Sequence, residues 1–261
     1  MKILLTNDDG YDAEGIVSLY EALKGEHELC MVAPSGNRSG ASSSFSPFQK
    51  HFLRKHSEGM YSLDGTPVDC ILSALKGKYL PFVPDVVLSG INRGGNLGTD
   101  IMYSGTCGAA RQACLAGIPA VALSCEYCRD ADGNYIFDYR RLAEFASKNL
   151  SALIAHCGTE DERKHLYPYF VNVNAPSGIP YRGIKFASIS QRIYHDKVNI
   201  TQENDENLYS TCIEGGEVSS VGDEGCDALL IQSGFLAVSC VYTEPVADLS
   251  FCGKGTSQFI L

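Results

Sequence analysis

Short runs of apolar residues alternate with segments of helical periodicity over the first 125 residues of the chain. Between the runs, segments such as 14–25 carry apolar residues three and four positions apart, which is typical of helices with one buried face. The runs themselves are continuously apolar, as expected of strands that are buried on both faces. This alternation predicts a parallel sheet with helices on both sides. The expected strands lie at 2–7, 27–34, 84–92 and 119–125, and further helices at 66–77 and 105–117.

The residues at the ends of these segments support the helix predictions. Thr66, Pro67 and Asp69 have the spacing of an N-cap, a first helical residue and a capping-box acid. Gly25 follows the last apolar residue of the first helix and is expected to end it.

The second half of the chain has a different pattern. Residues 138–156 predict one long helix, and 167–176 predict another buried strand. From about residue 180 the segments become short and alternating, as in 183–200 and 234–244, which predicts β-hairpins rather than further strand-helix-strand units. We therefore expect one domain spanning residues 1–261, with a β-rich extension in its last third.

Composition and charge narrow the class of protein. A formal charge of −10 and a pI near 5.0 argue against a nucleic-acid duplex or an anionic membrane surface as the partner. Eleven cysteines, odd in number and scattered through apolar stretches, are typical of reduced and buried thiols. With no apolar run long enough for a membrane span and no signal-like start, we expect a cytoplasmic protein.

Two adjacent carboxylates, Asp8 and Asp9, follow the first predicted strand. One of them could cap the following helix while the other is solvated. Alternatively, the pair holds a cation, because two neighbouring carboxylates raise each other's pKa unless a positive charge neutralises them. The nearby loops at strand ends add oxygen donors from Ser39, Asn92 and Asn96, a set that suits Mg²⁺ or Mn²⁺ rather than Zn²⁺.

A second candidate site is the expected helix start at Ser104, Gly105 and Thr106. Backbone N–H groups and hydroxyls at such a start favour a phosphate, although plain N-capping explains the same residues. The chain lacks GxxxxGK[ST], and lacks GxGxxG after its first strand, so neither a P-loop nor a dinucleotide site is expected. Arg38 and Arg93 are either phosphate partners or solvated surface residues.

Two other residue types are expected to be structural. The single pair Cys125 and Cys128 is weak support for zinc or redox chemistry, since no second pair accompanies it. None of the six histidines lies in the candidate loops, and none is assigned a catalytic role.

Four separated blocks of the sequence resemble the SurE family of stationary-phase survival proteins, namely "ILLTNDDG", "APSGNRSGAS", "DGTPVDC" and "SGINRGGNLGTDIMYSGTCGAA". Later segments, "VNVNAP" and "CDALLIQSGFLAVSCVYTE", resemble that family more loosely. The resemblance implies a Rossmann-like three-layer α/β sandwich with a mainly parallel sheet. It also implies a β-rich C-terminal extension that forms a homodimer or homotetramer.

The same resemblance implies a metal-dependent 5'-nucleotidase that hydrolyses nucleoside monophosphates, with one divalent cation, Mg²⁺ or Mn²⁺, in each subunit. The implied metal ligands are Asp8, Asp9, Ser39 and Asn92. The implied phosphate-side residues are Asn96, Ser104, Gly105 and Thr106, and catalysis is assigned to Asp8, Asp9, Asn96 and Ser104. Three departures from the family pattern, Cys107, Cys226 and "SCVYTE", touch none of these ligands.

Two other functions remain open from the sequence. A non-catalytic nucleotide-binding regulator could use the same loops. An aspartyl-phosphate phosphatase is less favoured, because such enzymes need a second acid two positions after the nucleophile, and position 10 is Gly10.

Overall fold

The computed structural model describes residues 1–246, so the last part of the expected domain, 247–261, lies outside the described residues. The helices are α1 (Glu14–Leu23), α2 (Pro67–Lys76), η1 (Gly98–Met102), α3 (Gly105–Leu115), α4 (Tyr139–Ala155) and α5 (Asp227–Gln232). The first strands are β1 (Lys2–Thr6), β2 (Glu28–Pro34), β3 (Leu53–Ser57), β4 (Met60–Leu63), β5 (Val86–Arg93), β6 (Ala120–Cys125), β7 (Cys128–Arg129) and β8 (Tyr135–Ile136). The later strands are β9 (Tyr169–Ala175), β10 (Ile184–Phe186), β11 (Gln191–Tyr194), β12 (Lys197–Gln202), β13 (Tyr209–Glu214), β14 (Val218–Val221) and β15 (Leu236–Tyr242).

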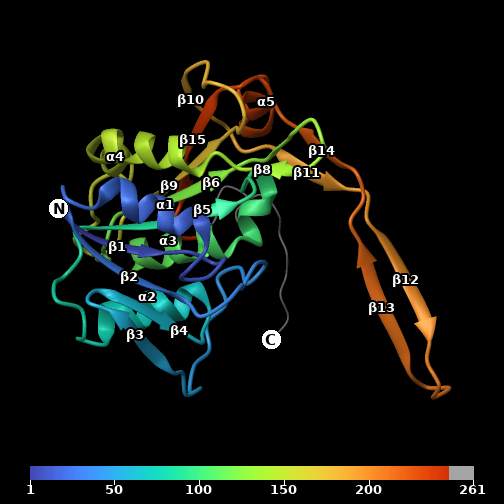
Figure 1. Cartoon of the computed structure of the whole chain (residues 1–261), viewed down its shortest axis with the longest axis horizontal. Helices are drawn as coiled ribbons and strands as arrows, with labels where there is room; N and C mark the ends of the chain where they lie inside the picture. The colour runs from blue at the N-terminus through green and yellow to red at the C-terminus, as the bar shows by residue number, and fades with distance from the viewer. Residues whose placement is uncertain (247–261) are drawn as a thin grey trace, which may run out of the picture.

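Nine strands form the central sheet, in the order β10-β15-β9-β6-β5-β1-β2-β4-β3 (Figure 1). The run from β9 to β4 is parallel, while β15 pairs antiparallel with β9 and β3 pairs antiparallel with β4. The expectation of a mainly parallel sheet is confirmed. In such a sheet, the loops after the strands meet at one edge, which is where ligands bind.

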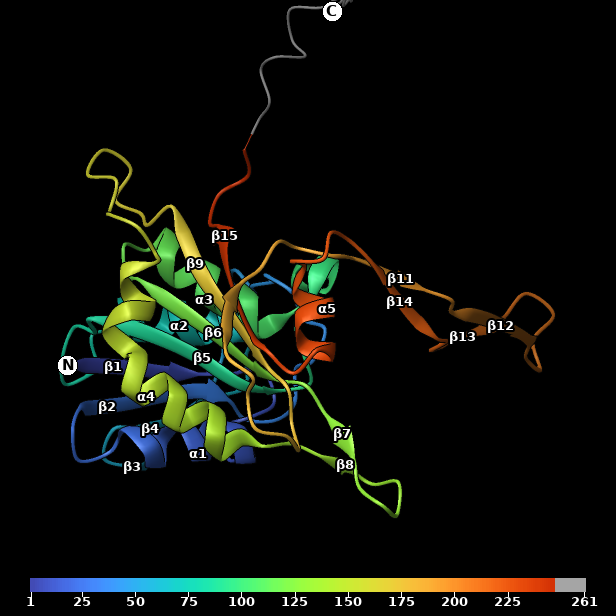
Figure 2. The same ribbon diagram turned by 90° about the horizontal axis from the view of Figure 1, so that it is seen from above.

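Helices cover both faces of this sheet (Figure 2), as expected from the apolar pattern. On β1, Ile3 and Leu5 face the layer of α1 and α4, whereas Leu4 faces the layer of α2 and α3. Successive residues of one strand therefore fill two separate cores, which explains why the strand sequences are continuously apolar. No helix within residues 1–246 is both long and apolar enough to cross a membrane.

The start of α2 forms as the sequence predicts. Thr66 Oγ1 accepts a hydrogen bond from the N–H of Asp69 at 3.1 Å, and the carboxylate of Asp69 accepts one from the N–H of Thr66 at 2.9 Å. The helix α1, by contrast, begins after Ala13 with no side-chain cap. Neither Asp8 nor Asp9 caps it, so the capping interpretation of the acid pair is wrong.

The β-rich region divides between the sheet and a projecting ribbon. Strands β12 and β13 form an antiparallel hairpin that extends away from the body, with β11 and β14 at its base (Figure 1). Below we call residues 197–214 the arm. The expectation that 234–244 forms a hairpin is wrong, because β15 lies inside the central sheet between β9 and β10. The first four residues of β15 are buried there. The strand pairs with β9 and β10, which are distant in the sequence, rather than with an adjacent segment.

The free cysteines in the described part of the chain are mostly buried, as expected. Cys125 lies in the core with its thiol 3.1 Å from the hydroxyl of Ser177, and Cys128 is half-buried beside Gly178.

Candidate active site

The loops after β1, β2 and β5 meet the start of α3 around one cavity of about 250 Å³. Five of the residues expected at the site line it, namely Asp8, Ser39, Asn92, Asn96 and Ser104. These residues come from segments up to 96 positions apart, between Asp8 and Ser104, which the parallel sheet brings to one edge.

Asp8 is almost completely buried, with 3% of its surface exposed. Its Oδ1 accepts a hydrogen bond of 2.6 Å from the hydroxyl of Thr106, and α3 begins directly against it. A Cβ on Gly105 would lie 2.8 Å from the Cβ of Asp8, so only glycine allows this approach. Burial raises the pKa of Asp8 to about 6; the bond from Thr106 opposes the rise, and the neighbouring charge of Asp9 adds to it.

The side chain of Asp9 faces a different cavity. Its Oδ2 accepts the N–H of Arg93 at 3.0 Å, and its side chain lines a separate cavity of about 380 Å³ together with Asn37 and Arg93. Burial raises the pKa of Asp9, and the contacts with Arg93 lower it. The two acids are therefore close enough to repel, yet they line different cavities, and Arg93 lines both of these cavities.

Ser39 and Asn92 supply neutral oxygens on the rim. The hydroxyl of Ser39 donates to Asn37 Oδ1 at 2.6 Å, which leaves the lone pairs of Ser39 Oγ for a cation. Asn92 Nδ2 donates to the carbonyl of Gly94 at 2.9 Å, which turns its Oδ1 away from that carbonyl. Both residues thus have an acceptor oxygen to offer, as a hard cation requires.

Asn96 is held by a network of buried amides. Its N–H donates to Asn174 Oδ1 at 2.8 Å, and its carbonyl accepts Nδ2 of Asn172 at 2.9 Å and Nδ2 of Asn174 at 3.1 Å. Its own Nδ2 donates to Ser124 Oγ at 2.8 Å. The loop that carries Asn96 is consequently fixed to β6 and β9.

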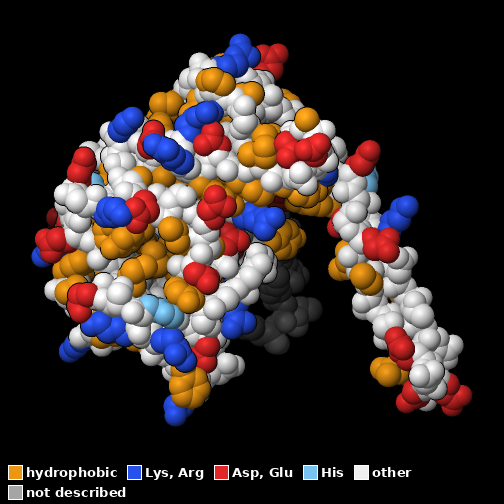
Figure 3. All heavy atoms as spheres, viewed as in Figure 1, with side chains coloured by type: hydrophobic (Ala, Val, Ile, Leu, Met, Phe, Trp, Pro, Cys, Tyr) orange, Lys and Arg blue, Asp and Glu red, His pale blue; other side chains and the backbone are white. Residues whose placement is uncertain are grey.

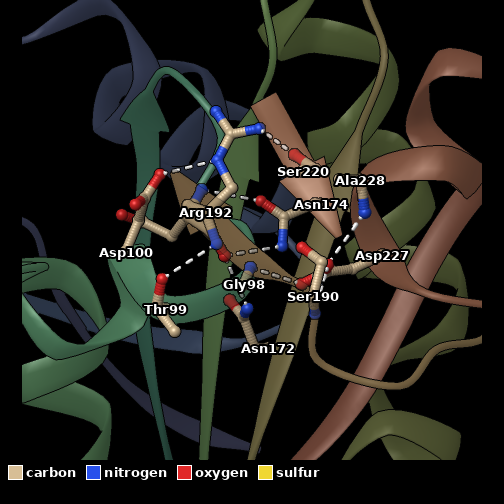
Figure 4. Close-up of polar contacts among 11 residues, drawn as sticks. Gly98, Thr99, Asp100, Asn172, Asn174, Ser190, Arg192, Ser220, Asp227 and Ala228 are labelled. Carbon is tan, nitrogen blue, oxygen red and sulfur yellow. Dashed lines mark hydrogen bonds and ion pairs between the residues drawn. The ribbon is translucent and has the colours of Figure 1, made fainter. Parts of the chain in front are cut away.

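The next turn of this loop is tied to the C-terminal region (Figure 4). The buried carboxylate of Asp227, at the start of α5, accepts the N–H of Gly98 at 2.6 Å and the N–H and hydroxyl of Ser190. Arg192 donates from its Nε to Asp100 at 3.1 Å and from Nη1 to Ser220 at 2.7 Å. The base of the arm and the candidate site therefore share one polar network.

The start of α3 matches the capping interpretation and leaves the phosphate interpretation possible. Ser104 Oγ accepts the N–H of Cys107 at 3.0 Å, so Ser104 is the N-cap. The hydroxyl of Thr106 is directed to Asp8 rather than to the cavity. The backbone N–H groups of Gly105 and Thr106 belong to the first turn of the helix, which has no earlier carbonyl to pair with them.

The two arginines differ in position. Arg93 lines both cavities and lies over the ring of Phe137, with its guanidinium carbon 5.2 Å from the ring centroid. Arg38 instead donates to the carbonyl of Asp64 at 3.0 Å. Arg93 is therefore the better placed of the two for an anion.

Several residues at the site were not identified from the sequence. Tyr103, Tyr194 and Asp100 line the cavity, and Asn172 and Asn174 hold its loop. The asparagines had a signal, because two amides two positions apart in a buried strand must pair on one face. Tyr194 had none, because the fold brings it to the cavity from a strand about 100 positions away.

The donor set fits a hard divalent cation. Within residues 1–246, no group of three or more His, Cys, Asp or Glu side chains is placed to hold a metal, so the zinc-type arrangement is absent there. The cavity instead gathers a carboxylate, a hydroxyl and amide oxygens, with a second carboxylate alongside. The raised pKa of Asp8 is the electrostatic cost that a cation would remove.

This cost predicts a pH-dependent gain in stability for Asp8→Asn in the metal-free protein. The folded-state pKa of about 6 exceeds the ordinary value of 3.8, so ionisation of Asp8 destabilises the fold above pH 6 and the effect disappears below pH 4. The variant should exceed the wild type by roughly 3 kcal/mol at pH 7, since 1.36 kcal/mol corresponds to one pKa unit.

Urea denaturation in EDTA at pH 7 and pH 4 measures this difference, with the exposed Asp12→Asn as the matched control. The gain should shrink toward zero at pH 4. A variant that is less stable than the wild type at pH 7, or a gain in stability that does not depend on pH, would contradict the claim that ionised Asp8 destabilises the fold.

Comparisons with known proteins identify the family of the chain. The family model "Survival protein SurE" matches residues 3–196. A relative from Polaromonas sp., named 5'-nucleotidase SurE, is 34% identical over 94% of this chain and 92% of its own. A relative of the same name from Pseudoalteromonas atlantica is 33% identical over 96% of each chain.

A solved structure agrees with these relatives. The crystal structure of the SurE protein from Aquifex aeolicus superposes with a TM-score of 0.74 at 31% identity, covering 94% of this chain and 95% of that one. Fold and site define an α/β protein with an acidic site at the carboxyl edge of its sheet. The chain belongs to the SurE family.

Proposed function

We propose that this protein is a divalent-metal-dependent phosphomonoesterase that hydrolyses nucleoside 5'-monophosphates to nucleoside and phosphate. The observation that carries the proposal is the placement of Asp8 in one cavity with Ser39, Asn92 and the start of α3, while Asp9, the next residue, lines the neighbouring cavity. Carboxylates for a cation thus lie beside N–H groups and a hydroxyl suited to a phosphate. The relatives named 5'-nucleotidase SurE support the same activity.

The family implies a divalent metal, and we propose one Mg²⁺ or Mn²⁺ ion for each chain, held by Asp8, Asp9, Ser39 and Asn92. When bound, such an ion polarises the phosphate and lowers the pKa of water. The carboxylates of Asp8 and Asp9 would neutralise its charge, and the residues around them would bind the phosphate.

The proposed roles on the phosphate side follow from the hydrogen bonds. Because Ser104 Oγ accepts the N–H of Cys107, its own proton remains available to a phosphate oxygen. Asn96, whose backbone is fixed by Asn172 and Asn174, presents its second Nδ2 hydrogen in the same way. Together with the N–H groups of Gly105 and Thr106, these donors stabilise the charge that develops on the phosphate.

We assign Asp9 as the general base that accepts the proton of the attacking water. Its Oδ2 is used by the N–H of Arg93, which leaves Oδ1 as the accepting atom. Burial raises the pKa of Asp9, and a more basic carboxylate is a better general base near neutral pH.

Phosphate release from a panel of substrates tests the proposed activity. Nucleoside 5'-monophosphates, 3'-monophosphates and p-nitrophenyl phosphate are compared with Mn²⁺, with Mg²⁺ and with EDTA. Release that requires the metal and is fastest from 5'-monophosphates supports the proposal. Nucleotide binding without release from any substrate would identify a regulator instead, and a phosphate trapped on Asp8 would identify an aspartyl-phosphate mechanism.

We further propose that the protein acts in the cytoplasm as a homodimer or homotetramer. The buried free thiols support a reducing compartment. The arm supports an assembly, because Val198, Ile200 and Ile213 are 58%, 68% and 69% exposed on a ribbon of only two strands. Figure 3 shows hydrophobic side chains at the surface of this projecting ribbon. A two-stranded ribbon is marginal in water, and exposed apolar side chains on it favour burial against another copy of the chain.

Removing the arm should therefore reduce the assembly without unfolding the body. Residues 197–214 can be replaced by a short turn between Asp196 and Gly215, whereas truncation near residue 180 would remove β15 from the central sheet. Sedimentation velocity should show a smaller particle for the armless chain and for Ile200→Asp. The neighbouring Asn199→Asp should sediment as the wild type, and an armless chain with unchanged assembly would contradict the proposal.

A further inference from the structure

The candidate cavity continues into a larger one. Gly95, Asp100 and Tyr194 line both the 250 Å³ cavity and a second cavity of about 530 Å³. The second cavity is closed by Glu126 and Tyr127 on one side and by the base of the arm and α5 on the other. A phosphomonoester held at Ser104 would therefore extend its alcohol portion past Tyr194.

Tyr194 is a fixed aromatic surface at this passage. It is the last residue of β11 and pairs with Val218 of β14. It lines both cavities beside Asp100, which accepts a hydrogen bond from Nε of Arg192 at 3.1 Å. Arg192 is held in turn by Ser220 and by Thr99 Oγ1, which accepts its backbone N–H at 3.1 Å (Figure 4). Burial and the contact with Asp100 raise the pKa of Tyr194 to about 12, so the ring stays neutral while 45% of the residue remains exposed.

We propose that the nucleoside part of the substrate binds in this second cavity, with its base stacked on the ring of Tyr194. The proposal rests on the phosphomonoesterase function above and names the part of the substrate that the phosphate site does not hold. Aromatic rings bind bases of any kind by stacking, and the carboxylate of Glu126 in the same wall is an acceptor for ribose hydroxyls.

The cavity beside Asp9 is the other aromatic-lined space at the site, and it fits a base less well. Its rings are already occupied, because Phe137 and Tyr139 stack on each other with centroids 5.6 Å apart and Arg93 lies over Phe137. Tyr135 there is 51% exposed and provides a comparison for Tyr194. Its ring meets that of Tyr127 edge-on, with centroids 4.7 Å apart.

Steady-state kinetics with Mn²⁺ on two substrates tests the proposal. A nucleoside 5'-monophosphate is compared with ribose 5-phosphate, which has the same reacting group and no base. Tyr194→Ala should raise KM for the nucleotide by about tenfold and change KM for ribose 5-phosphate less than about twofold, since one stacked base is worth 1–3 kcal/mol or more than fivefold in binding. Tyr194→Phe should keep most of the affinity, and Tyr135→Ala should raise KM for the nucleotide less than Tyr194→Ala does.

The outcomes separate this proposal from the function on which it rests. An equal loss on both substrates in Tyr194→Ala, or a larger nucleotide effect in Tyr135→Ala, would overturn the assignment of the nucleoside to the second cavity while leaving the phosphatase activity intact. No release from either substrate by the wild type would overturn the proposed function and this assignment with it.

Discussion

Asp8→Asn is expected to reduce metal-dependent phosphate release by at least about 10³-fold while the protein stays folded. The amide keeps the hydrogen bond from Thr106, because its Oδ1 still accepts, but it removes the negative charge that holds the cation. A loss of that size corresponds to about 4 kcal/mol in the barrier, within the range for removing the charge stabilisation that a metal supplies. Asp9→Asn should lose activity as well, because it removes a second ligand and the proposed base.

Asp12→Asn is the control for both variants, since Asp12 lies three residues after Asp9, is exposed and lines neither cavity. Its rate should equal that of the wild type, and circular dichroism should give the same spectrum for all four proteins. Wild-type turnover in Asp9→Asn, or a folded Asp8→Asn that keeps its rate, would show that the acid pair is not the metal site.

Removal of the metal is expected to abolish the activity completely and reversibly. The proposed ion both polarises the phosphate and lowers the pKa of the attacking water, so EDTA should leave no residual rate. Mn²⁺ or Mg²⁺ added in excess should restore it, and because two carboxylates with raised pKa values must lose their protons to bind the ion, more metal should be needed below pH 6.

A Zn²⁺ titration is a useful comparison, because the oxygen donors in the cavity favour harder ions. Activity that EDTA does not change, or that only Zn²⁺ restores, would contradict the proposed ion. Activity that returns with Mn²⁺ in the wild type and not in Asp8→Asn would connect the metal to its proposed ligand.

Local signals in the sequence were sufficient for most of the fold. The continuous apolar runs predicted β1, β2, β5, β6 and β9, and the capping residues of α2 formed the bonds that their spacing indicates. The strand β15 was wrongly predicted to be part of a hairpin, because an alternating pattern does not show which strands a segment pairs with. Its partners are β9 and β10. The six-residue helix α5 is too short to have a clear period.

The candidate site was predictable where its residues are close to strand ends and to one another. Asp8, Asn92 and Asn96 lie in the cavity for that reason. The divergence of Asp8 and Asp9 was not predictable, because the direction of each side chain depends on Arg93 and Thr106, which arrive from other strands and helices. Nor was Tyr194, whose position depends on the contacts of Asp100, Arg192 and the base of the arm.

The central claim is that Asp8 and its neighbours hold one divalent ion. Isothermal titration of Mn²⁺ into the metal-free wild type, at pH 7 and beside Asp8→Asn, tests it most directly. We predict one ion bound per chain by the wild type and no measurable binding by the variant. Equal binding by the two proteins, or none by the wild type, would contradict the claim.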